Sequence, residues 1–271
     1  MNLNGITAHI VAWLTDYASN AGVKGYVVGV SGGIDSALTA TLVARTGLPV
    51  QILEMPIHQP SDHVSRGQEL IAQLQSNHAN VASRVVNLTQ VFDAYSVALE
   101  LDATASTELS LANTRARLRM TTLYAEAQNL GMLVAGTGNK IEDFGVGFFT
   151  KYGDGGVDVS PIADLTKSEV RQLALSVGVP TSILQAQPTD GLWDDERSDE
   201  EQLGASYEEL EWAMAALEAE GWTADQEPSG LLARVSDRER NVLQIYMRFH
   251  RANRHKMVPI PVCTIPSQLK A

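Results

Sequence analysis

The chain has 271 residues, of which 44% are hydrophobic and 19% charged, and its formal net charge is −12. This length and composition predict one folded domain over residues 1–271, with a helical addition from about 200 to 271. The acidic charge argues against broad binding to nucleic acid or to an anionic membrane surface. The single cysteine, Cys263, excludes a disulfide framework and a cysteine metal cluster.

Helical and strand-like segments alternate along the chain. Apolar residues at helical spacing predict a first helix over 6–22, and a compact apolar run predicts the first strand over 26–30. Strands that alternate with helices predict an α/β fold, in which helices cover both faces of a doubly wound parallel sheet. The remaining expected elements are helix 34–45, strand 50–55, helix 61–76, strand 84–88, helices 89–99 and 109–130, strand 132–136, and helices 166–177, 206–220 and 236–250.

Polar or turn-forming residues follow three of the expected strands. Residues 31–36 follow the first strand, Met55 and Pro56 end the second, and residues 137–142 follow the fourth. Ligands bind beyond the carboxyl ends of parallel strands, so we expect these segments to line one crevice. The glycine-rich stretch 137–161 shows little periodicity and predicts a long functional loop.

The segment from Ser31 to Ser36 reads Ser-Gly-Gly-Ile-Asp-Ser, between the first strand and the helix that follows it. Its glycines let the backbone approach a ligand closely, and the first N–H groups of the helix point at an anion bound there. Because a carboxylate in such a site makes sense where a divalent cation separates it from phosphate, Asp35 predicts a bound divalent cation. The loop lacks the Gly-Lys-Ser/Thr ending of a Walker A sequence, which argues against γ-phosphate transfer.

This loop resembles the pyrophosphate loop of the N-type ATP pyrophosphatases, which cleave ATP between its α- and β-phosphates. Residues 136–160 read GTGNKIEDFGVGFFTKYGDGGVDVS. The chain is similar over most of its length to the ammonia-dependent NAD synthetases. This resemblance is carried by the string above, the Arg-rich helix 109–130, Pro188-Thr189 and His255-Lys256. The resemblance implies the Rossmann-like adenine nucleotide alpha hydrolase fold.

The resemblance also implies a reaction. In this family ATP adenylates the nicotinate carboxylate of deamido-NAD and releases pyrophosphate, and ammonia then displaces AMP to leave NAD. We therefore expect an ATP-dependent ligase with Mg²⁺ as cofactor and without a protein nucleophile, because metal ions and positioned cations stabilise the charged transition state. The chain begins close to its first helix, so we expect no amidase domain and ammonia that comes from solution or from a partner.

The ATP side of the site is implied by motif. Asp35 and Glu142 would be the two magnesium carboxylates, although the adjacent Asp143 is an alternative ligand. Lys167 lies in the first turn of its helix, where a cation opposes the helix dipole, so a phosphate contact is favoured over a structural role. The resemblance assigns ATP binding to Gly29, Val30, Ser31, Gly32, Gly33, Ile34, Asp35, Ser36, Met55, Thr137, Lys167 and Thr189.

The dinucleotide side is assigned to Arg117, Lys151, Asp158, His255 and Lys256. Arg117 lies beside the core stripe of helix 109–130 and is the arginine best placed to approach a cleft, whereas Arg115 and Arg119 are predicted to be solvated on the opposite flank. Asp158 could bind a ribose or cap a turn. The basic pair that ends the last helix could instead interact with the end of that helix.

The resemblance implies a homodimer with the dinucleotide pocket built across the subunit interface. Leu111 and Leu118 are apolar residues outside the core stripe of helix 109–130, so we expect them to lie in that interface. Two other functions stay open: an N-type ATP pyrophosphatase that amidates or thiolates another substrate, and a nucleotide-binding module without catalysis. A binding module would not need Asp35 and Glu142 as metal ligands.

The first residues lack a basic region followed by an apolar run, so we expect a cytoplasmic protein.

Overall fold

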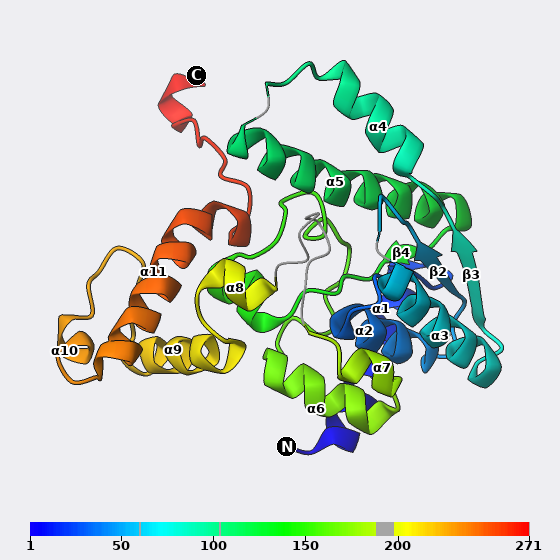
Figure 1. Ribbon diagram of the computed structural model, residues 1–271, viewed down its shortest axis with the longest axis horizontal. Helices are drawn as coiled ribbons and strands as arrows, with labels where there is room; N and C mark the ends of the chain where they lie inside the picture. The colour runs from blue at the N-terminus through cyan, green and yellow to red at the C-terminus, as the bar shows by residue number, and fades with distance from the viewer. Residues whose placement is uncertain (60, 103, 188–197, 271) are drawn as a thin grey trace.

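The computed structural model describes residues 1–59, 61–102, 104–187 and 198–270, and for residues 61–64 and 105 it describes the backbone alone. A four-stranded parallel sheet in the order β3-β2-β1-β4 lies among the helices (Figure 1). The strands are β1 (Tyr26–Gly29), β2 (Val50–Glu54), β3 (Val81–Val85) and β4 (Leu133–Val134).

The helices that pack on or near the sheet are α1 (Leu3–Ala21), α2 (Ile34–Ala44), α3 (Ser61–Asn77), α4 (Thr89–Ala98), α5 (Ala105–Leu130), α6 (Lys167–Val177) and α7 (Thr181–Leu184). A π-helical turn, η1 (Ile141–Val146), interrupts the loop after β4. The C-terminal part holds α8 (Asp199–Leu203), α9 (Tyr207–Ala219), α10 (Ser229–Leu232), α11 (Asp237–Met257) and the 3-10 turn η2 (Ser267–Leu269). No helix among the described residues is both long and apolar enough to cross a membrane.

Alternate residues of the strands pack on opposite faces of the sheet. In β1, Tyr26 and Val28 belong to the core that α1, α2 and α6 cover, whereas Val27 belongs to the core that α4 and α5 cover. Helices therefore cover both faces of the parallel sheet, as parallel sheets require. The predicted doubly wound α/β fold is confirmed.

The C-terminal helices form a buried cluster of their own, to the left of the sheet in Figure 1. Leu210 of α9 and Leu243 of α11 lie in this cluster together with Ile141 and Val146 of η1. The helical addition predicted from about residue 200 thus packs directly on the glycine-rich loop that follows β4. The C-terminal helices therefore cover part of this loop.

Most of the predicted elements lie within a few residues of the observed ones, because their ends have local signals. Gly22, Gly131 and Gly178 end α1, α5 and α6 in the left-handed conformation that favours glycine. Thr166 begins α6 with a capping box, in which its hydroxyl accepts from the backbone N–H of Glu169 and the Glu169 carboxylate accepts from the backbone N–H of Thr166.

The third strand was predicted wrongly at 84–88, because it lies at Val81–Val85. This strand is at the edge of the sheet, and only Val81 among its residues is buried. Its register follows from pairing with β2, where Val81 lies opposite Val50. Apolar composition therefore could not locate it, since the more apolar residues 85–88 run past the end of the paired segment.

Candidate active site

The loop between β1 and α2 is built around one left-handed glycine and two serines. Gly32 has φ +84°, a conformation that favours glycine. The Ser36 hydroxyl accepts from the backbone N–H of Ser31 at 3.2 Å and donates to the carbonyl of Gly33 at 3.0 Å. These bonds hold the loop open at the start of α2, where unpaired N–H groups attract an anion.

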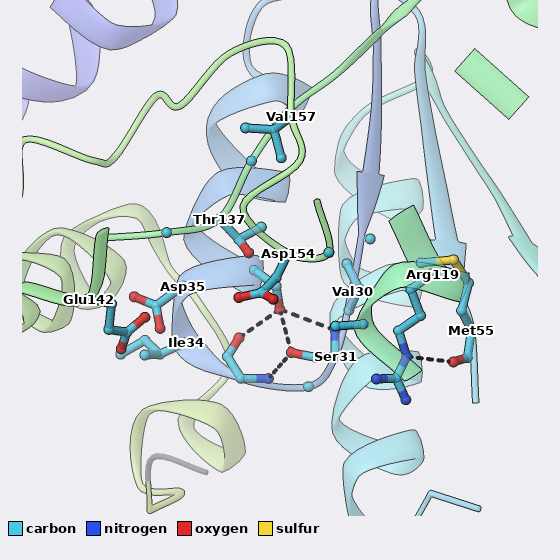
Figure 2. Close-up of a pocket in the computed structure, with 18 of the residues that line it drawn as sticks. Val30, Ser31, Ile34, Asp35, Met55, Arg119, Thr137, Glu142, Asp154 and Val157 are labelled. Carbon is cyan, nitrogen blue, oxygen red and sulfur yellow. Dashed lines mark hydrogen bonds between the residues drawn. The ribbon is translucent and has the colours of Figure 1, made fainter. Parts of the chain in front are cut away.

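The predicted crevice forms at this edge of the sheet. Its lining includes the loop from Gly29 to Ser36, Met55 at the end of β2, Thr137 after β4, and Lys167 of α6. Figure 2 shows Asp35 and Glu142 at one end of this cleft and Arg119 with Met55 at the other. The three predicted strand ends thus line one cleft, and within the described part of the chain the residues predicted to bind ATP gather there. Thr189 lies outside the described residues.

Lys167 connects the loop to the turn η1. Its side chain is 3% exposed, and its ammonium donates to Asp35 Oδ2 at 2.6 Å and to Glu142 Oε1 at 3.0 Å. Burial disfavours the charged lysine, but the attraction of Asp35 and Glu142 outweighs it and raises the pKa of Lys167. Burial raises the pKa of Asp35, whereas the pKa of Glu142 is lowered because the attraction of Lys167 and the bond from Tyr207 overcome burial.

Asn139 fixes the two carboxylates relative to each other. It is fully buried, and its Oδ1 accepts from the backbone N–H groups of Ile141 and Glu142, both at 3.1 Å. Its Nδ2 donates to Asp35 Oδ1 at 3.2 Å. One amide side chain therefore starts the turn η1 and orients Asp35, a role that the sequence analysis did not assign.

Two further acids of the cleft have raised pKa values. Burial, together with the negative charges of Glu142 and Asp154, raises the pKa of Asp143 to about 8. Desolvation in the cleft likewise raises the pKa of Asp154 to about 6. Perturbed carboxyl groups that face one cleft are typical of sites that handle protons or cations.

Arg115 and Arg119 do not lie on a solvated face, so that prediction was wrong. Arg119 lines the cleft, where its Nε donates to the carbonyl of Met55 at 3.1 Å and its Nη2 donates to Gln59 Oε1 at 2.8 Å. Arg115 places its guanidinium 4.6 Å from the ring centroid of Phe92 in α4. The segment after β2 and helix α4 cover this flank of α5, which the periodicity of one helix does not reveal.

The predicted dinucleotide residues lie outside the lining of the cleft, but three of them form a row. Arg117 is exposed, and its Nε donates to the carbonyl of Lys151 at 3.3 Å. The ammonium of Lys151 donates in turn to the carbonyl of His255 at 2.7 Å. Residues from α5, the glycine-rich loop and α11 are thus linked by hydrogen bonds, although they are far apart in the sequence.

The other two dinucleotide candidates have structural contacts within the chain. The Asp158 carboxylate accepts from the Tyr124 hydroxyl at 3.1 Å and from the backbone N–H of Val134 at 2.8 Å. The Lys256 ammonium donates to the carbonyls of Gly147 and Phe149, both at 2.8 Å. Asp158 therefore supports the end of the sheet, and Lys256 fixes the loop after η1.

The predicted interface residues are not a free apolar patch. Leu111 and Leu118 are half-buried and pack against the core under α4 and α5. The exposed large apolar residues of α4, α5 and the segment between them are instead Val91, Tyr95 and Val97 of α4, Leu101 after it, and Leu109 of α5.

Comparison with known proteins places this geometry in a family. The model of the family NAD synthase matches residues 6–259. The chain belongs to the NAD synthase family. It is 37% identical to the NH(3)-dependent NAD(+) synthetase of Alkaliphilus metalliredigens over 94% of this chain and 96% of that protein.

Solved structures agree with this membership. NMN synthetase from Francisella tularensis has a TM-score of 0.82 and 30% identity, and the match covers 98% of this chain and all of that one. The NH3-dependent NAD synthetase from Campylobacter jejuni, in complex with nitrate, has a TM-score of 0.74 and 27% identity over 97% of this chain and all of that one. The predicted fold, the ligase class and the function of an ammonia-dependent NAD synthetase, with ATP as co-substrate, are confirmed.

The donor set of the cleft suits a hard divalent cation. Asp35 and Glu142 present carboxylate oxygens toward one point, where the ammonium of Lys167 bridges them. Among the residues that the structure describes, no three His, Cys, Asp or Glu side chains gather closely enough to hold a metal ion unaided. Mg²⁺ commonly binds to one or two carboxylates and completes its shell with water and substrate phosphates, so these two side chains fit it.

Proposed function

We propose that the cleft binds ATP with its phosphates on the loop from Ser31 to Ser36, and that Asp35 and Glu142 hold Mg²⁺ there. The observation that carries this assignment is the buried ammonium of Lys167, which lies between the two carboxylates at the edge of the loop. A buried cation that two acids hold in place is available to an approaching phosphate without reorganisation. When bound, Mg²⁺ would neutralise phosphate charge as the α-phosphate is attacked.

The chain would then orient two reacting groups. The nicotinate carboxylate of deamido-NAD attacks the α-phosphate, and the bond between the α- and β-phosphates breaks to release pyrophosphate. Ammonia next attacks the carbonyl carbon of the adenylate, and AMP leaves with the former carboxylate oxygen. Asp154 lines the cleft, and burial raises its pKa to about 6, which is close to neutral pH and suits a general base that takes the proton that ammonium must lose.

A homodimer with a shared dinucleotide pocket accounts for the residues that lie outside the cleft. Arg117 and Lys151 are joined in a row on the surface, where a second copy of the chain would enclose them. The exposed apolar residues Val91, Tyr95 and Val97 of α4 are candidates for the contact, in place of Leu111 and Leu118. The cytoplasmic location inferred from the sequence stays a prediction.

The test of the proposed function is the product set. With deamido-NAD, ATP, Mg²⁺ and ammonium, the protein should form NAD, AMP and pyrophosphate in equal amounts. Asp35→Asn keeps the shape of the side chain but removes a hard anionic ligand, so it should need far more Mg²⁺ while it stays folded. Formation of ADP and phosphate would contradict adenylation, and unchanged Mg²⁺ dependence in folded Asp35→Asn would contradict the ligand role.

A second acid substrate is supported by the likeness to NMN synthetase, which covers nearly the whole chain. An enzyme of this kind would amidate nicotinic acid mononucleotide, which lacks the adenylate half of deamido-NAD. Comparison of kcat/KM for the two acids decides between them. Arg117→Ala should change the ratio of the two kcat/KM values only if the additional adenylate half of deamido-NAD contacts the surface around Arg117.

A further inference from the structure

Tyr207 brings a hydroxyl from the C-terminal helices into the catalytic cleft. It is the first residue of α9, its side chain is fully buried, and its hydroxyl donates to Glu142 Oε1 at 2.6 Å. Its ring lies 4.7 Å from the ammonium of Lys167. One side chain therefore contacts both the carboxylate and the cation that we place at the phosphates of ATP.

The contact restrains Glu142 at a single oxygen. Glu142 Oε1 accepts from the ammonium of Lys167 at 3.0 Å and also from the hydroxyl of Tyr207. A glutamate carboxylate on a flexible side chain samples several rotamers, and two donors on one oxygen select one of them. The second oxygen of the carboxylate is then held in a fixed direction relative to Asp35.

The hydroxyl is itself fixed by the start of the C-terminal helices. Ser206 caps α9 with a capping box, and the backbone N–H of Tyr207 donates to Glu200 Oε1 of α8 at 3.1 Å. Asp199 Oδ2 of α8 lies 3.2 Å from the same hydroxyl, as a second acceptor. The position of the hydroxyl thus depends on α8 and on the packing of α9 against α11, η1 and α6.

We infer that Tyr207 is a positioning residue for Glu142, which it holds in the orientation that receives a divalent cation together with Asp35. This inference rests on the proposed function of Glu142 as a metal ligand. It gives the C-terminal helices a part in the reaction: they complete the cation site of a cleft that the sheet alone leaves incomplete.

The test uses Tyr207→Phe in the full-length protein, because phenylalanine keeps the ring and removes the hydroxyl. Loss of a hydrogen bond to a charged group should raise the Mg²⁺ concentration for half-maximal activity about tenfold. The rise in melting temperature that Mg²⁺ causes with a non-hydrolysable ATP analogue should need a similarly higher Mg²⁺ concentration. Tyr246→Phe is the matched control, since Tyr246 is also buried and packs on Gly145 of η1, but its hydroxyl makes no hydrogen bond with other described residues.

A double-mutant cycle separates positioning from general stability. If Tyr207 acts through Glu142, Tyr207→Phe should have little further effect on Mg²⁺ dependence in a Glu142→Gln background. Independent effects that multiply, or a folded Tyr207→Phe protein with wild-type Mg²⁺ dependence, would overturn the inference. A wild-type protein that responds to Mg²⁺ in neither assay would instead overturn the proposed function of Glu142.

Discussion

Replacement of Lys167 by methionine tests the charge balance on which the cleft depends. Methionine keeps the length of the side chain and removes the ammonium. The lysine side chain is 3% exposed, whereas the side chains of its partners Asp35 and Glu142 are 17% and 16% exposed. Removal of one partner of a buried ion pair leaves uncompensated charge and typically costs about 3–5 kcal/mol. We therefore expect Lys167→Met to lower the free energy of unfolding by about 3–5 kcal/mol at neutral pH.

The assay is urea unfolding with and without Mg²⁺. The loss should shrink as the pH falls through the raised pKa of Asp35, because a protonated carboxyl no longer needs the ammonium. Mg²⁺ should restore part of the loss, since a divalent cation replaces the missing charge. Lys140→Met is the control, because Lys140 pairs at 3.6 Å with the fully exposed Asp164 and should change stability by less than about 0.5 kcal/mol. A loss below about 1 kcal/mol in Lys167→Met, or no effect of Mg²⁺, would refute the reasoning.

Three further predictions follow from other residues of the cleft and the surface beside it. Arg119→Ala should mainly raise the KM for ATP, and Arg117→Ala should mainly raise the KM for deamido-NAD, each by roughly tenfold or more. If both variants raised the KM of the same substrate, the assignment of Arg119 to ATP and of Arg117 to deamido-NAD would be contradicted. The pKa of Asp143 is raised to about 8 in the folded protein, so metal-free wild type should lose stability as the pH rises toward 8, because the unfolded chain releases this proton at lower pH. Asp143→Asn should therefore raise the melting temperature at pH 8 more than at pH 4, and an equal change at both would count against burial of that charge. A Cβ at Gly138 would lie 2.1 Å from Asp143 Oδ2, so Gly138→Ala should lower kcat, whereas Gly230→Ala, where a Cβ meets nothing within 4 Å, should keep wild-type kcat.

The features that the sequence predicted correctly have local causes. Helix ends at Gly131 and Gly178 and the cap at Thr166 depend on residues within one turn of the chain. The loop from Ser31 to Ser36 also forms within six residues, because Gly32 and Ser36 supply its conformation and its internal bonds. Parallel strands then bring their carboxyl ends to one edge, so the cleft could be predicted once the alternation of strands and helices was recognised.

The features that the sequence missed depend on contacts between distant segments. Arg119 was placed on a solvated face because its partners, Met55 and Gln59, come from the segment after β2. The turn η1 was expected as irregular loop, since a π-helical turn depends on how Asn139 and the C-terminal helices hold it. No periodicity indicates that Tyr207 reaches Glu142, which is 65 residues away along the chain.

The most direct test of the central claim follows one oxygen atom. Deamido-NAD that carries ¹⁸O at both oxygens of its nicotinate carboxylate should be converted with ATP, Mg²⁺ and ammonium, and the products should be analysed by mass spectrometry. An adenylated carboxylate transfers one of its oxygens to the α-phosphate, so we predict one ¹⁸O atom in each AMP and none in pyrophosphate. Unlabelled AMP, or label in pyrophosphate, would contradict the account.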